Sequence, residues 1–210
     1  MAELSTVTEV VAVQTDVTDP ASVEHLAQQA GERFGGIDVW INNAGIGSDG
    51  RWWESATEDT VRVIQTNLTA PILGARAALQ WMLPKGRGHI INVGSVAGHV
   101  SVSGVYSATK FGLRGHTHAL RRELARKGIQ VSLVSPGFVR TEMTQRVTFP
   151  MPTANVVADV IERLIRHPRR DVVVPGWYRL LIIFTKLFPG LTDWGMARWG
   201  SRFQSQTRSR

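Results

Sequence analysis

The sequence predicts an α/β fold in which a doubly wound parallel sheet carries helices on both faces. The main observation is that short runs of β-branched residues alternate with longer segments of helical periodicity. A second is that no internal repeat or low-complexity linker interrupts this alternation, so the 210 residues form one domain. A third is a composition of 43% hydrophobic and 20% charged residues, which excludes a disordered, collagen-like or coiled-coil chain.

The elements can be justified in chain order. Residues 10–13 (VVAV) predict a first strand, and Asp19 with Pro20 predicts the cap and first position of a helix. That helix ends at Gly35 and Gly36, and a lysine-glycine pair ends a later one. Further strands are expected at 37–41, 89–93, 129–134 and 171–174, and further helices at 57–84, 103–126 and 154–166.

Positive charge is concentrated at the end of the chain. Residues 160–210 hold ten Lys and Arg against three Asp and Glu, which accounts for the whole net charge of +7. An apolar stretch, 177–188, lies within this region, and we consider a lid, a dimer core or a shallow contact with a membrane surface for it. Nucleic acid is not expected as a partner, because no motif that reads bases accompanies the charge.

The chain contains no cysteine, so a disulfide framework and a thiolate metal site are excluded. His116 and His118 are two apart on a predicted helix and point in different directions, so no metal is expected. The first residues lack the basic n-region and the apolar h-region of a signal peptide. The protein is therefore predicted to be cytoplasmic, and a peripheral contact with a membrane is the alternative.

Tyr106 and Lys110 are the first candidates for chemistry. Four residues apart on a helix, they project from the same face. An ammonium group beside a phenol favours the phenolate, so we expect the pKa of Tyr106 to be lowered toward the range useful for acid–base catalysis. Ser95 follows the predicted strand at 89–93, at the edge where open α/β sheets bind ligands, and its hydroxyl could hold an oxygen presented to Tyr106.

With these residues in order, the chain resembles the short-chain dehydrogenase/reductase family. The resemblance covers roughly residues 10–144 and is specific as a set, although no single motif would be. The matching segments are 16–19 (DVTD), 42–45 (NNAG), Asn67, 94–95 (GS), 106–110 (YSATK) and 135–141 (SPGFVRT).

This resemblance implies a Rossmann-like sheet and a role for each matching residue. Tyr106 would be the general acid or base, Lys110 would lower the tyrosine pKa and bind the nicotinamide ribose, and Ser95 would orient the substrate oxygen. Asn67 would anchor a water in a proton relay to Lys110. The catalytic set is thus Asn67, Ser95, Tyr106 and Lys110. The cofactor-binding set is Asp16, Val17, Asn43, Ala44, Gly45, Tyr106, Lys110, Pro136, Gly137, Val139 and Thr141.

The main departure from the family pattern lies at the front of the chain. The family begins with two strands and a glycine-rich turn that are missing here, so the fold is expected to be N-terminally truncated, with 10–13 as the third family strand. That leaves a gap of about 14 Å beside the strand at 37–41, unless 10–13 shifts inward or a sheet face stays open. Residues 45–50 spell G-x-G-x-x-G, but no helix follows at once and no acidic residue lies about 20 positions later, so this fingerprint is rejected.

The sequence therefore predicts a single domain over 1–210, with 1–150 as cofactor and catalytic core and 151–210 on the substrate side. The predicted activity is reversible, NAD(P)(H)-dependent interconversion of a carbonyl and an alcohol on a small or medium apolar substrate, with NADP slightly favoured over NAD. The alternative is a catalytically impaired fragment that acts as an interaction or membrane-surface protein. A homo-dimer or tetramer is implied by the resemblance. Trp52 and Trp53 line a substrate mouth or cover the helix that begins near Thr57.

Overall fold

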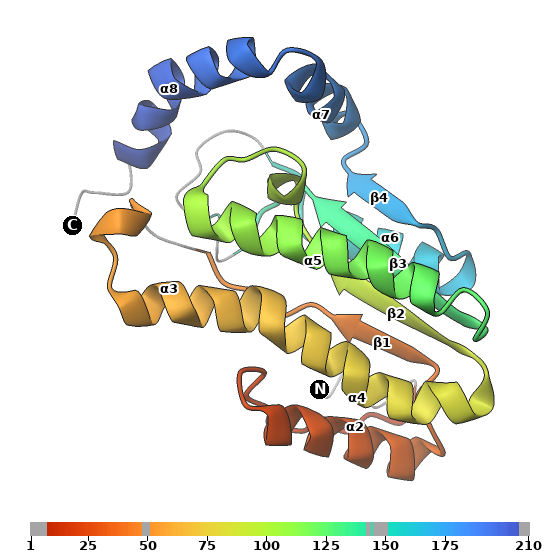
Figure 1. The fold of residues 1–210 in the computed structure, drawn as a ribbon. Coiled ribbons are helices and arrows are strands. Elements are labelled where there is room, and N and C mark those ends of the chain that lie inside the picture. The colour runs from red at the N-terminus through yellow and green to blue at the C-terminus, as the bar shows by residue number, and fades with distance from the viewer. Residues whose placement is uncertain (1–7, 48–50, 142–143, 145–150, 206–210) are drawn as a thin grey trace.

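A four-stranded parallel sheet forms the centre of the protein (Figure 1). The computed structural model describes residues 8–47, 51–141, 144 and 151–205. The strands lie in the order β1 (Val39–Asn42), β2 (Gly88–Val93), β3 (Ile129–Pro136) and β4 (Asp171–Val174). The helices are α2 (Pro20–Phe34), α3 (Thr57–Ile64), α4 (Ala70–Lys85), α5 (Gly104–Glu123), α6 (Asn155–Arg166), α7 (Tyr178–Leu187) and α8 (Pro189–Ser205).

Helices cover both faces of this sheet, as the doubly wound prediction requires. Ile90 of β2 packs with α4 and α5 in one core cluster, whereas its neighbour Ile91 packs with Leu164 of α6 in another. Successive side chains of a strand point to opposite faces, so α6 lies behind the sheet in Figure 1 and the other two helices in front. Helix α2 packs beside α4, where the Trp81 ring occupies the space that a side chain at Gly31 would need.

The predicted helix ends are confirmed where capping residues mark them. The Asp19 carboxylate accepts hydrogen bonds from the backbone N–H groups of Ala21 and Ser22, and Gly35 ends α2 at a φ of 72°. The long helix predicted over 57–84 is interrupted by one π-helical turn, Gln65–Thr69, which separates α3 from α4. Such turns widen the backbone locally and occur often at functional sites, and this one contains Asn67.

The strand predicted at 10–13 is wrong, because the structure shows no strand between residues 8 and 38. This segment runs beside α2 instead, where Glu9 and Arg33 form an ion pair at 2.7 Å. A β-branched run forms a stable strand only when its backbone pairs with a neighbouring strand, and residues 10–13 do not pair with β1. Val11 and Ile41 stay partly exposed as a result. The proposed absence of two family strands and their glycine-rich turn stays a prediction.

The last two helices lie beyond the sheet edge formed by β4 (Figure 1). Helix α7 covers part of that edge through Tyr178 and Ile182, which pack with Val173 of β4. Within the described residues, no helix combines the length and the apolar content needed to span a membrane.

Candidate active site

The candidate site is built where β2 and β3 end side by side. Val93 and Val134 are paired in register, and the Gly94 N–H donates a 2.7 Å hydrogen bond to the Val134 carbonyl. Ser95 then caps a short 3₁₀ turn by accepting a hydrogen bond from the Ala97 N–H at 3.1 Å. The loops after both strands therefore leave the sheet together, at the edge where parallel α/β sheets bind ligands.

Helix α5 presents Tyr106 and Lys110 to this edge. The Lys110 Nζ lies 5.7 Å from the centroid of the Tyr106 ring and donates a hydrogen bond to the Val93 carbonyl at 3.2 Å. Only 5% of Lys110 is exposed. Ser95 lies close enough to Tyr106 for its hydroxyl to affect the pKa of the phenol. The structure thus brings together three of the four residues predicted to be catalytic.

Burial dominates the electrostatics of this pair. It raises the pKa of Tyr106 above its ordinary value, and the polar side chain of Ser95 opposes that shift. Burial also lowers the pKa of Lys110 to about 8. The expectation that the pKa of Tyr106 lies below its ordinary value is therefore wrong, because desolvation of the phenol is the largest effect on it. At neutral pH, Tyr106 is a neutral phenol that can donate a proton.

Asn67, the fourth predicted residue, ties a loop to the site. Its fully buried carboxamide accepts a hydrogen bond from the Ile46 N–H at 2.9 Å and donates to the Ile46 carbonyl at 2.8 Å. A longer bond of 3.4 Å reaches the Thr109 hydroxyl. A Cβ at Gly45 would lie 3.3 Å from the Asn67 Oδ1 and 3.4 Å from the Lys110 Nζ. Glycine therefore lets the loop after β1 approach the lysine closely.

This loop is not a dinucleotide-binding fingerprint, which agrees with its rejection above. Gly45 and Gly47 belong to an irregular segment after β1, and 48–50 lie outside the described residues. The next α-helix, α3, begins only at Thr57, after a 3₁₀ turn at Trp52–Glu54.

Several positions of the predicted cofactor-binding set gather at the other end of the same loop. Val17, Asn43 and Ala44 line a cavity of about 90 Å³ between α2, β1 and α4. The Asp16 carboxylate accepts hydrogen bonds from the hydroxyl of Thr18 at 2.7 Å and from its backbone N–H at 2.8 Å, and these two bonds lower the pKa of Asp16. Residues 43–46 therefore connect this cavity with Asn67 and Lys110.

The remaining positions of the predicted cofactor-binding set, Pro136, Gly137, Val139 and Thr141, lie at the end of β3 and after it. Pro136 ends the strand, Val139 is buried and Thr141 is exposed. The Thr144 hydroxyl donates to the Val139 carbonyl at 2.6 Å and accepts from the Thr141 N–H at 2.9 Å, which closes a tight turn. Residues 142–143 and 145–150 lie outside the described part of the chain.

Tyr178 holds this segment and was not predicted as a site residue. Its ring lies where a side chain at Gly137 would stand, and its hydroxyl accepts a hydrogen bond from the Phe138 N–H at 3.2 Å. The spacing of Tyr178 and Ile182, four residues apart, could have indicated that both are buried on one face of α7, as the structure shows. Helix α7 is thereby attached to the loop after β3.

His99 forms a second contact between the two loops, also not predicted. Its Nε2 lies 3.0 Å from the Ser135 hydroxyl and 3.9 Å from the Asp171 carboxylate. Burial lowers the pKa of His99 to about 4, although the charge of Asp171 acts in the opposite direction. His99 is therefore neutral at physiological pH and links the loop after β2 to the end of β3.

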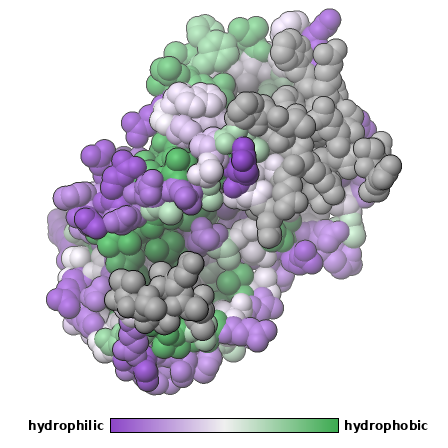
Figure 2. All heavy atoms as spheres, turned by 180° about the vertical axis from the view of Figure 1, so that it is seen from behind, coloured by the Kyte–Doolittle hydropathy of each residue, from purple (hydrophilic) through white to green (hydrophobic). Residues whose placement is uncertain are grey.

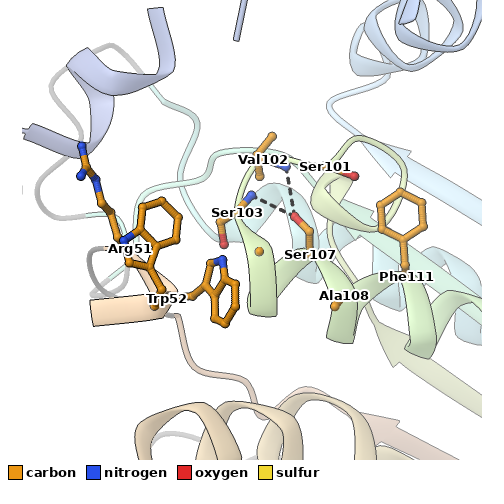
Figure 3. Close-up of a pocket in the computed structure, with 10 residues that line it drawn as sticks. Arg51, Trp52, Ser101, Val102, Ser103, Ser107, Ala108 and Phe111 are labelled. Carbon is orange, nitrogen blue, oxygen red and sulfur yellow. Dashed lines mark hydrogen bonds between the residues drawn. The ribbon is translucent and has the colours of Figure 1, made fainter. Parts of the chain in front are cut away.

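Another pocket lies away from this site (Figure 3). It measures about 510 Å³ and is lined by Trp52, Trp53, Ala108 and Phe111, among others. At 100° per residue, Ala108 and Phe111 project from the face of α5 opposite Tyr106. Trp52 packs against Gly104, where a Cβ would lie 2.7 Å from the indole. Trp52 therefore lies against the start of α5.

The residues of the site fit one half of a nicotinamide dinucleotide. Lys110 is a buried cation with a carbonyl as its hydrogen-bond partner, and Gly45 leaves space beside it, which suits a ribose hydroxyl. The starts of α2 and α3 do not match the diphosphate in the same way. The Asp19 carboxylate already caps α2, and Glu58 and Asp59 lie in the first turn of α3. Negative side chains at those helix starts do not attract phosphate.

Comparisons with known proteins agree on one family. The sequence model of the short chain dehydrogenases matches residues 1–150. The 3-oxoacyl-[acyl-carrier-protein] reductase FabG of Vibrio cholerae serotype O1 is 38% identical over 143 residues, which cover 67% of this chain and 59% of that protein. The human 3-oxoacyl-[acyl-carrier-protein] reductase is 40% identical over 136 residues, covering 64% of this chain and 57% of the relative. The chain thus spans less than three fifths of these curated relatives.

Solved structures show the same fold. A short chain dehydrogenase/reductase from Burkholderia phymatum in complex with NAD superposes with a TM-score of 0.82 and 26% identity, over 91% of this chain and 80% of the other. Levodione reductase superposes with a TM-score of 0.75 and 26% identity, over 83% of this chain and 79% of the other.

Proposed function

The chain belongs to the short-chain dehydrogenase family, and we propose that it interconverts a carbonyl and an alcohol on a small or medium apolar substrate, with NADP or NAD as cofactor. The observation that carries this proposal is the convergence of Ser95, Tyr106 and Lys110 at the carboxyl edge of the sheet. A polar cluster of this kind, with a buried lysine of shifted pKa, is typical of a site selected for chemistry.

Tyr106 acts as the general acid when a carbonyl is reduced. Its raised pKa keeps the proton on the phenol at neutral pH, so the proton is available for the substrate oxygen as negative charge develops there. Ser95 lies beside Tyr106 and would hold the same oxygen. The nicotinamide, when bound, supplies or accepts the hydride.

Lys110 assists the reverse reaction, the oxidation of an alcohol. Below a pH of about 8 it carries a positive charge near the Tyr106 ring, which favours the phenolate needed to accept a proton from an alcohol. Its remaining N–H groups are suited to a ribose hydroxyl. The Asn67 side chain is occupied by Ile46, so a water relay at this position would use the backbone carbonyl of the π-helical turn.

The cofactor would extend from this site along the loop after β1. Gly45 lies nearest to Lys110, and Asn43 and Ala44 lead to the cavity beside Val17. Pro136, Gly137, Val139 and Thr141 would border the nicotinamide from the β3 side. The names of the relatives make a 3-oxoacyl thioester the first substrate class to test.

A homo-oligomer is the second part of the proposal. Apolar side chains remain partly exposed on the outer faces of α3, α4 and α5, the helices adjacent to the site, and these are Val61, Ile64, Ile72 and Phe111. An apolar strip on monomeric helices is typical of a subunit interface. Tyr106 belongs to α5, and Asn67 belongs to the π-helical turn between α3 and α4.

The test is a titration of the full chain with NADPH and with NADH, following energy transfer from its seven tryptophans. We expect saturation in the micromolar range, and the two titrations measure the cofactor preference directly. A 3-oxoacyl thioester is then reduced by the wild type and not by Tyr106→Phe, which still binds cofactor. A folded chain that binds neither dinucleotide contradicts the enzyme proposal.

A further inference from the structure

Helix α7 and the start of α8 carry large apolar side chains in solvent. Tyr178 and Ile182 are buried on one face of α7, whereas Leu180, Ile183 and Leu187 are 72%, 53% and 66% exposed on the opposite face. Trp177, just before α7, and Leu191 and Trp194 of α8 are exposed as well. We name these six exposed residues the α7–α8 surface: Trp177, Leu180, Ile183, Leu187, Leu191 and Trp194. Figure 2 shows apolar side chains gathered at the end of the molecule where Figure 1 places α7.

Positive charge borders this surface. Arg179 and Lys186 are exposed and stand at positions i and i+7, so they lie along one side of the apolar stripe of α7. Arg198 lies over the Trp194 ring at 5.9 Å from its centroid. Between Trp177 and Arg198, Asp193 is the single acidic residue in the sequence.

We propose that the α7–α8 surface docks onto an anionic phospholipid bilayer, with α7 lying in the plane of the interface. Apolar side chains on one face of a helix, basic residues beside them and tryptophans at the ends match the interfacial zone of such a bilayer. The lipid headgroups supply the negative charge that the cations require. The absence of a membrane-spanning helix among the described residues agrees with attachment at the surface.

Charge favours lipid over a second copy of the chain as the occupant. In a twofold symmetric dimer, the same patch would meet itself, which would bring Arg179 and Lys186 of both copies close together. Like charges that face each other across an interface weaken it, and Asp193 alone cannot compensate for them. An anionic bilayer is complementary to the same residues.

The proposal is tested by cosedimentation of the full chain with vesicles, and catalytic activity does not enter the readout. Vesicles of phosphatidylcholine mixed with phosphatidylglycerol should retain the protein, and phosphatidylcholine alone should retain far less. The double variant Leu180→Glu/Leu187→Glu should lose binding, because it places charge on the apolar stripe. Phe34→Glu, at a 51% exposed phenylalanine of α2, is the control and should bind like the wild type.

A second variant keeps the proposal falsifiable if the first changes the fold. Arg179→Gln/Lys186→Gln should weaken binding about thirtyfold at low salt, since each cation near an anionic surface contributes about a factor of five. Circular dichroism checks that both variants are folded. Equal binding to neutral and mixed vesicles, or unchanged binding by Leu180→Glu/Leu187→Glu, overturns the proposal. The proposal is also overturned if the protein does not bind vesicles and instead self-associates through this surface in sedimentation velocity.

Discussion

Two regions of the molecule depart from the usual distribution of polar and apolar groups, in opposite directions. At the candidate site, Lys110 keeps an ammonium group at 5% exposure with the Val93 carbonyl as its hydrogen-bond partner. At the α7–α8 surface, Leu180 places an aliphatic side chain in solvent at 72% exposure. Buried charge costs stability, and a large exposed apolar patch indicates a missing partner. Both departures therefore indicate requirements other than folding.

The difference between them concerns how each region depends on individual residues. The site is held by short contacts between particular atoms, such as those of Asn67 with Ile46. The surface depends on summed area and charge, so its residues should replace one another within a chemical class. Single substitutions at the site should therefore have large effects, and single substitutions at the surface should have small ones.

The largest effect is expected at Tyr106. Tyr106→Phe removes the phenol proton that is proposed to pass to the substrate oxygen, so kcat should fall about 10²- to 10⁴-fold. Steady-state kinetics measures this loss, and the melting temperature should stay close to that of the wild type. An active Tyr106→Phe variant would exclude this phenol as the general acid.

Replacing Lys110 should separate catalysis from stability. The pKa of Lys110 is about 8 in the folded protein and 10.5 as its reference value, so the folded state resists protonation. Below pH 8 this cost is fully present, and wild-type stability should rise as pH increases from about 8 toward 10.5. Lys110→Met removes the charge and should raise the free energy of unfolding at pH 7 by about 3 kcal/mol while activity is lost.

Urea denaturation at several pH values measures this prediction. Lys127→Met, at an exposed lysine, is the matched control and should change the free energy of unfolding by less than about 0.5 kcal/mol. A Lys110→Met variant that is less stable than the wild type at pH 7 would show that its hydrogen bond to Val93 outweighs the desolvation of the charge.

Local sequence patterns were sufficient for most of the fold and for placing Tyr106 and Lys110 on one helix face. Asp19 and Gly35 marked both ends of α2, and the spacing of Tyr106 and Lys110 placed them on one face of α5. These features depend on residues close in sequence, whose geometry a helix fixes.

Features that depend on distant parts of the chain could not be predicted in this way. The β-branched run around Val11 indicated a strand, but a strand also needs a partner, and none pairs with it. The pKa of Tyr106 depends on how much protein covers it, which spacing does not reveal. The contact of Tyr178 with Gly137 joins segments about 40 positions apart through a close approach of ring and backbone.

Asn67 should show an intermediate effect. Asn67→Ala leaves the Ile46 N–H and carbonyl without their partner and should lower the free energy of unfolding by about 2 kcal/mol. The loop after β1 then loses its position beside Lys110, so KM for the cofactor should rise. Thermal unfolding and cofactor titration measure the two effects. A stable Asn67→Ala variant with unchanged KM would show that the contact of Asn67 with Ile46 does not position the loop.

The smallest effect is expected on the exposed face of α7, and it gives the sharpest comparison because both positions belong to one helix. Leu180→Ala removes a side chain that lies in solvent, so the free energy of unfolding should change by less than about 0.5 kcal/mol. Ile182→Ala, two residues away, removes contacts with Val173 and Tyr178 and should cost about 2 kcal/mol. Denaturation of both variants measures the difference. Equal losses at the two positions would mean that the apolar stripe already packs against protein in solution, and the surface would then belong to an assembly of this chain.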